Sequence, residues 1–432
     1  MSSELNKTHP HWSVRALRAL RYRDFRLFFV GQTISLVGTW MQIIAMSWLV
    51  YRLTNSPFML GLVGFCGQIP SMFVAPFAGV LADRWERRKI LVATQTLSMI
   101  QALAIASLVL TGWISVWQLI PLSVFLGCIN AFDIPARQSL FVEMVEDRND
   151  LGNAIALNSS MVNGARLIGP SVAGILIAIV GEGVCFLING ISFLAVIGAL
   201  LAMRPSPRRH VTEHPPVLAS LKEGFTYAFG FSPVRSVLLL LALVSVVGVP
   251  YSVLMPIFAE KILHGGPHTL GFLMGTAGFG ALAGAIYLAS RPTVHGLGRI
   301  LVMAVTLFGV GLVAFSFSTN VWVSMLLLLT TGFGMLIGLA GCNTILQTIV
   351  DDDKRGRIMS FYTMAFMGMT PWGNLLAGGL ASRFGAPLTV RMGGIACILG
   401  ALIFATRLPR IRELVRPIYA SKNILPTPES DG

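Results

Sequence analysis

Residues 79–89 read GVLADRWERRK and place charged side chains at six of the seven positions 83–89, between two long apolar segments. The flanking segments, residues 53–82 and 90–132, contain no Asp, Glu, Lys or Arg. An apolar run of about 20 residues is long enough to cross the hydrocarbon core of a bilayer as a helix. We therefore expect membrane helices on both sides of this stretch and a short charged connection at the water boundary.

The composition of the whole chain supports a membrane protein. Of 432 residues, 54% are hydrophobic and only 12% are charged, and the mean hydropathy is +0.73. Such a chain cannot cover a water-soluble surface, so we expect an all-α membrane protein embedded in a lipid bilayer. The net charge of +13 does not indicate a nucleic-acid partner, because the basic residues gather at the ends of the apolar runs.

Charges and Gly, Pro and Asn turns divide the chain into twelve predicted spans. These cover approximately residues 26–51, 57–82, 90–111, 115–136, 153–180, 183–203, 234–258, 268–290, 299–318, 320–349, 357–381 and 386–406. We expect five regions: an N-terminal segment 1–25 with a short interfacial helix, a six-helix bundle 26–203, a linker 204–233, a second six-helix bundle 234–406, and a partly disordered tail 407–432.

The distribution of basic residues predicts the orientation. Twelve spans place both termini on one side of the membrane. Of the 32 Lys and Arg residues, only Arg52, Lys261, Arg383 and Arg391 fall on the opposite side, and Arg166 falls inside a span. By the positive-inside rule, both termini are predicted to be cytoplasmic.

An internal repeat predicts two related halves. A shift of 204 residues superposes glycines of spans five and six on glycines of spans eleven and twelve. The pairs are Gly152 and Gly356, Gly164 and Gly368, Gly169 and Gly373, Gly174 and Gly378, Gly181 and Gly385, and Gly190 and Gly394. This spacing favours duplication and a pair of pseudo-symmetric bundles around a central cavity.

The stretch at 79–89 resembles the loop signature of the major facilitator superfamily. Gly79, Leu81, Ala82, Asp83, Arg84, Arg87 and Arg88 are in register, and Glu86 stands where that family usually has glycine. The segments DIPARQSLFVEMV, AIALNSSMVNGARLIGPSVAG and NTILQTIVDDDKRGRIMSFYTMAFMGMTPWGNLLAGGLA are similar to the branch that contains enterobactin-exporter-like and macrolide-efflux-like proteins. The resemblance covers about residues 25–405 and implies the major facilitator fold and an inner-membrane secondary exporter.

The resemblance also implies roles for the charged loop. Asp83 is expected to meet the N-terminus of span eleven, where exposed N–H groups carry partial positive charge. Arg87 is expected to pair with Asp133 at the end of span four. With Gly79, Arg84 and Arg88, these residues would latch the two halves while the cavity faces outward and release them when it opens inward.

Span five contains a second informative segment, NGARLIGPSVAG. Gly169, Pro170 and Gly174 match the Gly-Pro motif of drug antiporters, although Ala173 replaces one glycine and Gly164 lies one position off. Pro170 is expected to kink the helix, and packing and a role in transport direction are both open interpretations. Ser159, Asn163 and Arg166 share one helical face. Arg166 is expected to face the cavity, with a structural bond to backbone carbonyls as the alternative.

Polar and aromatic residues inside the spans are candidates for cargo contacts, although each also suits interhelical packing. They are Gln32, Trp40, Gln42, Gln68, Tyr251, Asn343, Gln347, Trp372 and Asn374. A mostly apolar cavity with few fixed charges favours amphiphilic or hydrophobic small molecules, such as drugs, siderophores or lipid-like metabolites.

No Asp or Glu lies in the middle of a predicted span, and the arginine that the superfamily places in span four is absent. Proton antiport is therefore only what the family resemblance implies, with Asp24 or Asp133 as boundary acids that could titrate.

The leading hypothesis is an exporter that works by alternating access, expected to be monomeric. An importer or lipid flippase on the same fold is the alternative, and a transport-inactive sensor or scaffold is the alternative of another class. An enzyme is not expected. The seven His residues lie in termini, loops or span ends, and the five cysteines are scattered singly, so no catalytic site, metal site or cofactor is predicted.

Overall fold

The computed structural model describes residues 17–204, 225–291 and 293–421, with residues 75–77, 79–84, 148, 352–353 and 421 described by backbone alone. All of its regular elements are helical. In the first half these are η1(Arg18–Arg21), α2(Arg23–Thr54), α3(Pro57–Arg84), α4(Arg87–Leu110), α5(Val116–Glu143), α6(Arg148–Val180) and α7(Glu182–Ala202). In the second half they are α9(Ser232–Leu243), η2(Val244–Gly248), η3(Val249–Leu254), α10(Met255–Ile257), η4(Phe258–Ile262), α11(Pro267–Ala289), α12(Leu297–Phe315), α13(Val321–Ile349), α14(Asp352–Thr363), η5(Met364–Gly368), α15(Thr370–Phe384) and α16(Ala386–Ser421).

The twelve predicted spans all appear as helices or as chains of helices, which confirms the predicted fold class. Within the described residues, eleven helices are long and apolar enough to cross a membrane. The remaining span, α14 to α15, is interrupted by the π-helical turn η5. Its first part is polar, as the sequence DDKRGRIMSFYT shows. The span between residues 232 and 262 is also irregular, because Pro250 and Pro256 each remove a backbone donor from it.

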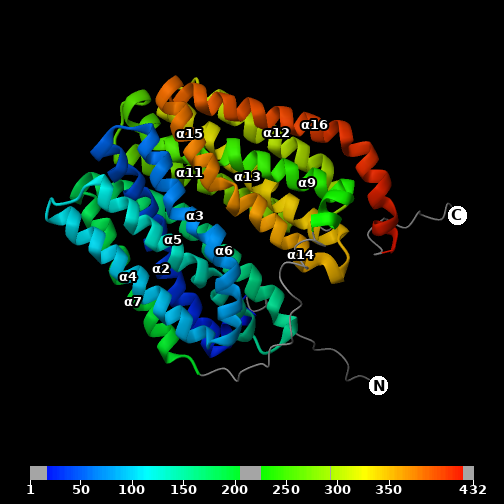
Figure 1. Ribbon diagram of the computed structural model, residues 1–432, viewed down its shortest axis with the longest axis horizontal. Helices are drawn as coiled ribbons and strands as arrows, with labels where there is room; N and C mark the ends of the chain where they lie inside the picture. Colours follow the sequence, from blue (N-terminus) through cyan, green and yellow to red (C-terminus); the bar gives the residue numbers. More distant parts are fainter. Residues whose placement is uncertain (1–16, 205–224, 292, 422–432) are drawn as a thin grey trace, which may run out of the picture.

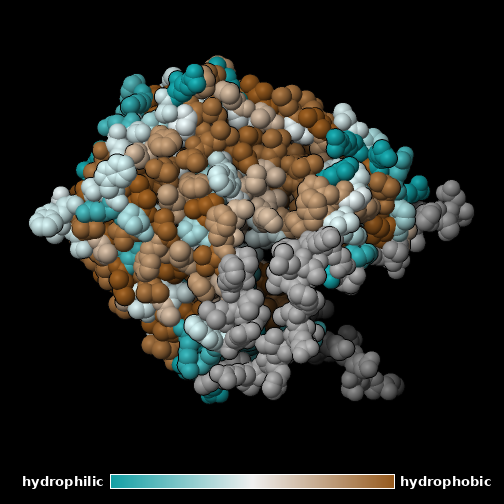
Figure 2. Space-filling model, in the orientation of Figure 1, coloured by the Kyte–Doolittle hydropathy of each residue, from teal (hydrophilic) through white to brown (hydrophobic). Residues whose placement is uncertain are grey.

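The helices form two groups that follow the order of the chain. In Figure 1, α2 to α7 (blue to green) lie together and α9 to α16 (green to red) lie together. The groups approach each other at the upper left and diverge toward the end at which α2 (dark blue) begins and α16 (red) ends. Figure 2 shows a broad apolar surface between polar patches at the periphery, as a bilayer requires. Below, the end that carries both termini is called the termini end, and the opposite end is called the far end.

Two helices continue well beyond the spans predicted for them. Span four was expected to end at residue 136, but α5 continues to Glu143 despite Pro135. The last span was expected to end at residue 406, but α16 continues to Ser421. Leu408, Ile411 and Val415 of this extension are buried, so an amphipathic stripe holds residues that were assigned to a partly disordered tail.

The N-terminal helix is attached to the protein rather than only lying at an interface. Its described part is η1, and the backbone N–H of Ala19 donates to Oδ1 of Asn153 at 2.9 Å. Arg21 forms an ion pair with Asp150 at 2.8 Å. Its hydrogen bond to the Tyr22 hydroxyl, with the nearby Asp150 charge, raises the pKa of the Arg21 guanidinium. Residues 1–16 and most of the expected linker lie outside the described residues.

Candidate functional site between the two helical halves

Two glycine crossings join the halves near the far end. Gly174 of α6 faces Gly271 of α11, and a Cβ built on Gly174 would lie 2.8 Å from the Cα of Gly271. Gly61 of α3 faces Gly378 of α15, and a Cβ built on Gly378 would lie 2.9 Å from the Cα of Gly61. Glycine lets two helix backbones approach this closely because it has no side chain to separate them. Both contacts cross between the halves.

The two crossings are equivalent by the internal repeat. Gly174 and Gly378 are one of the glycine pairs that a shift of 204 residues superposes. Each sits late in its helix and meets a glycine that lies early in a helix of the other half. The sequence showed the repeat but not which helices its glycines would meet.

Toward the termini end, the halves do not pack against each other in this way. A Cβ built on Gly152 or Gly164 of α6, or on Gly356 of α14, would meet nothing within 4 Å. On the same side, Ser159 of α6 and Gln347 of α13 are exposed. Polar side chains exposed on membrane helices face water or a cavity rather than lipid. The space between the halves therefore opens toward the termini end.

Arg166 lies midway along α6, one turn nearer the termini end than Pro170. Its guanidinium carbon lies 5.1 Å from the centroid of the Trp40 ring of α2. Tyr251 of η3, in the other half, lies nearby. The Nε atom of Arg166 is buried and has no hydrogen-bond partner within the described part of the chain. A cation at this depth costs about 2.5–3.5 kcal/mol on insertion scales, and the Trp40 ring offsets only part of that cost.

The predicted polar face of α6 has mixed outcomes. Asn163 donates from Nδ2 to the backbone carbonyl of Ser159 at 2.8 Å, so its amide is partly used within the helix. Gly169 faces α2, where a Cβ would lie 2.5 Å from the Cβ of Trp40. The backbone carbonyl of Pro170 lies against Gly271 in the far-end crossing. The Gly-Pro motif therefore packs α6 against both α2 and α11.

Several cargo candidates are buried in contacts within the protein. Gln42 donates to Oε1 of Gln101 at 3.0 Å and accepts from Nδ2 of Asn189 at 2.6 Å. This buried network joins α2, α4 and α7 within the first half, away from the space between the halves. Gln32 is also buried, 3% exposed. Asn374 is 3% exposed and packs against Gly64 of α3, so it belongs to the contact between the halves.

Other candidates retain accessible polar surface. Gln68 of α3 is exposed. On α13, Nε2 of the exposed Gln347 donates to Oδ1 of Asn343. Trp372 of α15 is 45% exposed, and its ring lies 5.2 Å from that of Phe65 in the first half. These side chains remain candidates for contacts with cargo.

The charged loop pairs differently from the prediction. Arg87 pairs with Glu143 at the end of α5, and Nη1 of Arg88 donates to the carbonyl of Met203 at 2.7 Å. All of these partners belong to the first half, so the expected Arg87–Asp133 pair is not formed in this state, which is open at the termini end, and it remains a prediction for the state that faces outward. Glu143 was missed because span four was ended too early. The side chains of Gly79, Asp83 and Arg84 lie outside the described ones, so their expected roles remain predictions.

Asp133 is not a boundary acid. It is 1% exposed and lies within α5, where it pairs with Arg137 one turn later. It accepts hydrogen bonds from Oγ1 of Thr94 at 2.9 Å and Nε2 of Gln95 at 2.6 Å, both on α4. The sequence predicts no carboxylate in the interior of a span, but α5 continues seven residues beyond the predicted end of span four and so places Asp133 inside the helix.

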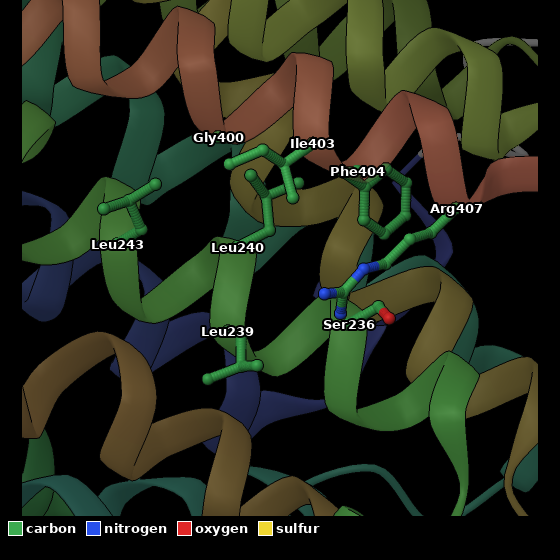
Figure 3. Close-up of a pocket in the computed structure, with 8 residues that line it drawn as sticks. All are labelled: Ser236, Leu239, Leu240, Leu243, Gly400, Ile403, Phe404 and Arg407. Atoms are coloured by element: carbon green, nitrogen blue, oxygen red, sulfur yellow. The ribbon is translucent and has the colours of Figure 1, made fainter.

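A groove on the second half is separate from the space between the halves. It lies between α9 and α16 and is lined by the side chains that Figure 3 labels, among them Leu240, Leu243 and Phe404, with Arg407 and Ser236 at one end. Leu239 and Ile403 at its rim are 49% and 58% exposed. Exposed apolar side chains on membrane helices suit lipid contact.

Metal chemistry has no visible basis in the part of the chain that the structure describes. No group of three or more His, Cys, Asp or Glu side chains there could hold a metal ion. All five cysteines are free thiols.

Comparison with protein families decides the classification. The model of a family described as "Transmembrane secretion effector", of the major facilitator superfamily, matches residues 14–429. The chain belongs to this family. Among similar relatives, the Staphyloferrin A transporter of Staphylococcus aureus (strain NCTC 8325 / PS 47) is 23% identical over 385 residues, covering 88% of this chain and 95% of that protein. The multidrug efflux pump Tap of Mycobacterium tuberculosis (strain ATCC 25618 / H37Rv) is 26% identical over 407 residues, covering 90% and 94%.

Solved structures confirm the major facilitator fold of this family member. A bacterial homologue of the human lysosomal transporter Spinster, in an inward-facing and unoccupied conformation, superposes with a TM-score of 0.66 at 14% identity, covering 94% of this chain and 99% of that chain. A bacterial homologue of the iron transporter ferroportin, in an inward-facing state, gives 0.66 at 16% identity, covering 89% and 98%.

Proposed function

We propose that this major facilitator protein exports amphiphilic or hydrophobic small molecules by alternating access. The observation that carries the proposal is the arrangement of the two halves, which touch through the far-end glycine crossings and diverge toward the termini end. Such a space can admit cargo from one side only. The named functions of two relatives, a siderophore transporter and a multidrug efflux pump, support an organic cargo of this kind.

The orientation of the chain gives this space its direction. The excess of Lys and Arg at the termini end supports a cytoplasmic location for both termini in an inner membrane. The described state would then open to the cytoplasm and load cargo there. Export requires the Gly174–Gly271 and Gly61–Gly378 crossings to separate while the termini end closes. We propose that Asp83 stabilises that closed termini end through the N-terminus of α14.

Proton antiport remains the proposed source of energy. This proposal rests on the family resemblance and is tied to no residue that the structure describes. The protein is proposed to act as a monomer.

Transport by purified protein in reconstituted vesicles tests the proposal. A panel of neutral, cationic and anionic fluorescent amphiphiles would be offered with and without an imposed pH gradient. Export predicts movement toward the far-end side, accelerated by a proton gradient of opposite direction. Accumulation on the termini side would indicate an importer, movement of labelled phospholipid alone would indicate a flippase, and no movement of any compound would favour a sensor or scaffold.

A further inference from the structure

We infer that Arg166 and the rings of Trp40 and Tyr251 form a site for the anionic group of an amphiphilic cargo, which places that group at mid-membrane. The inference rests on the proposed transport function and adds the charge of the substrate to it. The three side chains come from α6, α2 and η3, and therefore from both halves of the protein.

The charge of Arg166 has no counter-charge among the described residues. Among the other arginines toward the far end, Arg52 pairs with Glu182 at 2.8 Å, Arg391 donates from Nε to the hydroxyl of Ser316 at 3.3 Å, and Arg383 is exposed. For Arg166, the described residues provide no hydrogen bond and no carboxylate, only the Trp40 ring. A half-buried arginine whose Nε atom is buried and which has no counter-charge is suited to bind one from outside the chain.

The position of Arg166 also favours contact with cargo. Arg166 precedes the far-end crossing by two helical turns, and Gly278 of α11 packs against its backbone carbonyl. Cargo that enters from the termini end would meet Ser159 and Asn163 first and Arg166 last. The guanidinium therefore lies at the closed end of the entry path, where a bound group would touch both halves.

The side chains around this position favour an anionic group. A guanidinium presents several N–H donors in a planar fork that matches a carboxylate or phosphate. Trp40 offers aromatic surface beside it, and the nearby Tyr251 is buried, 5% exposed. Apolar walls around a single cation select an anionic head on a hydrophobic body. They disfavour organic cations, which Arg166 would repel.

Binding to the purified full-length protein in non-ionic detergent tests the inference. The probes are 11-(dansylamino)undecanoic acid and its methyl ester, which differ in charge and share the same apolar body. The native protein is expected to bind the acid at least about tenfold more tightly than the ester, because a charge-assisted hydrogen bond contributes that difference in affinity. Arg166→Gln is expected to reduce the affinity for the acid to that for the ester and to leave the ester unchanged.

Two variants control for indirect effects. Arg391→Gln removes an arginine that also lies over an aromatic ring, Phe317 at 3.7 Å, and is expected to keep the native preference for the acid. Arg166→Lys keeps the charge and is expected to keep part of the preference. Equal binding of acid and ester by the native protein would overturn the inference. So would an undiminished preference in Arg166→Gln, or a folded Arg166→Lys with no preference.

The source of the anion can be separated in the same assay. Arg166-dependent displacement of the acid probe by lysophosphatidylglycerol would assign the site to lipid headgroups, and displacement only by soluble carboxylates would assign it to a free metabolite. Transport that occurs without any preference for acids overturns this inference but not the export proposal. A preference for acids without any transport supports this inference and overturns the export proposal.

Discussion

Gly174 of α6 and Gly271 of α11 touch backbone to backbone, so that a Cβ on Gly271 would lie 2.7 Å from the Cα of Gly174. No side chain fits between these helices without moving one of them. The contact joins the first half of the chain to the second at the far end, and the repeat places an equivalent contact between Gly61 and Gly378. Together the two crossings account for a structure that is closed at one end and open at the other.

Gly174→Ala is expected to weaken closure of the far end, because the added methyl group meets backbone atoms that cannot rotate away. We expect a several-fold lower transport rate and easier modification of cysteines placed at the far end. Gly164→Ala on the same helix is the matched control, because a Cβ there meets nothing within 4 Å. It should leave transport unchanged and make α6 slightly more stable. Equal effects of the two substitutions would contradict this role for the crossing.

Removal of Arg137 alone is expected to destabilise the protein strongly, because it leaves the buried Asp133 carboxylate without its counter-charge. Breaking a buried pair in this way costs about 3–5 kcal/mol. The double variant Asp133→Leu/Arg137→Leu should recover most of that loss. Lys89→Ala breaks the ion pair with Glu86, in which the Lys89 side chain is 79% exposed, and should cost no more than about 1 kcal/mol. Thermal unfolding in detergent measures the stability of Arg137→Leu, the double variant and Lys89→Ala. A loss of stability in Arg137→Leu no larger than that in Lys89→Ala would refute the buried pair.

The sequence predicted the helices well but their polar partners poorly. Uncharged apolar runs such as residues 90–132 define spans directly, because length and hydropathy are local properties. Asp133 was misplaced because the polar residues that follow it, ARQS, are typical of a membrane boundary, and only packing against Thr94 and Gln95 of α4 keeps α5 helical and buried there. Likewise, nothing in the sequence distinguishes Gln42, which bonds to Gln101 and Asn189, from Gln68, which is exposed.

Gln42→Ala and Gln68→Ala therefore separate structure from cargo contact. Gln42→Ala removes two buried hydrogen bonds and leaves Gln101 and Asn189 without a partner on α2, so it should lower the free energy of unfolding by about 1–3 kcal/mol. It should not change the KM for transport. Gln68→Ala should unfold at the native temperature, and any effect it has should appear in the KM. The reverse pattern would show that Gln42 contacts cargo.

Asp83→Asn tests the proposed latch at the termini end. Without the carboxylate, the partial positive charge at the N-terminus of α14 loses its partner, and the state closed at the termini end should become rarer. We expect slower transport with an unchanged melting temperature, because exposed charge contacts of this kind contribute only about 0–1 kcal/mol. Full transport with unchanged populations of the two states would refute the latch.

Distances between spin labels test alternating access most directly. The labels are placed in a variant whose native cysteines are replaced. Labels at Trp113 and Trp322, which are 79% and 76% exposed, report on the far end. Labels at Glu146 and Asp351 report on the termini end. The account predicts that a transported compound lengthens the first distance and shortens the second. Both distances staying fixed while a compound is transported would contradict it.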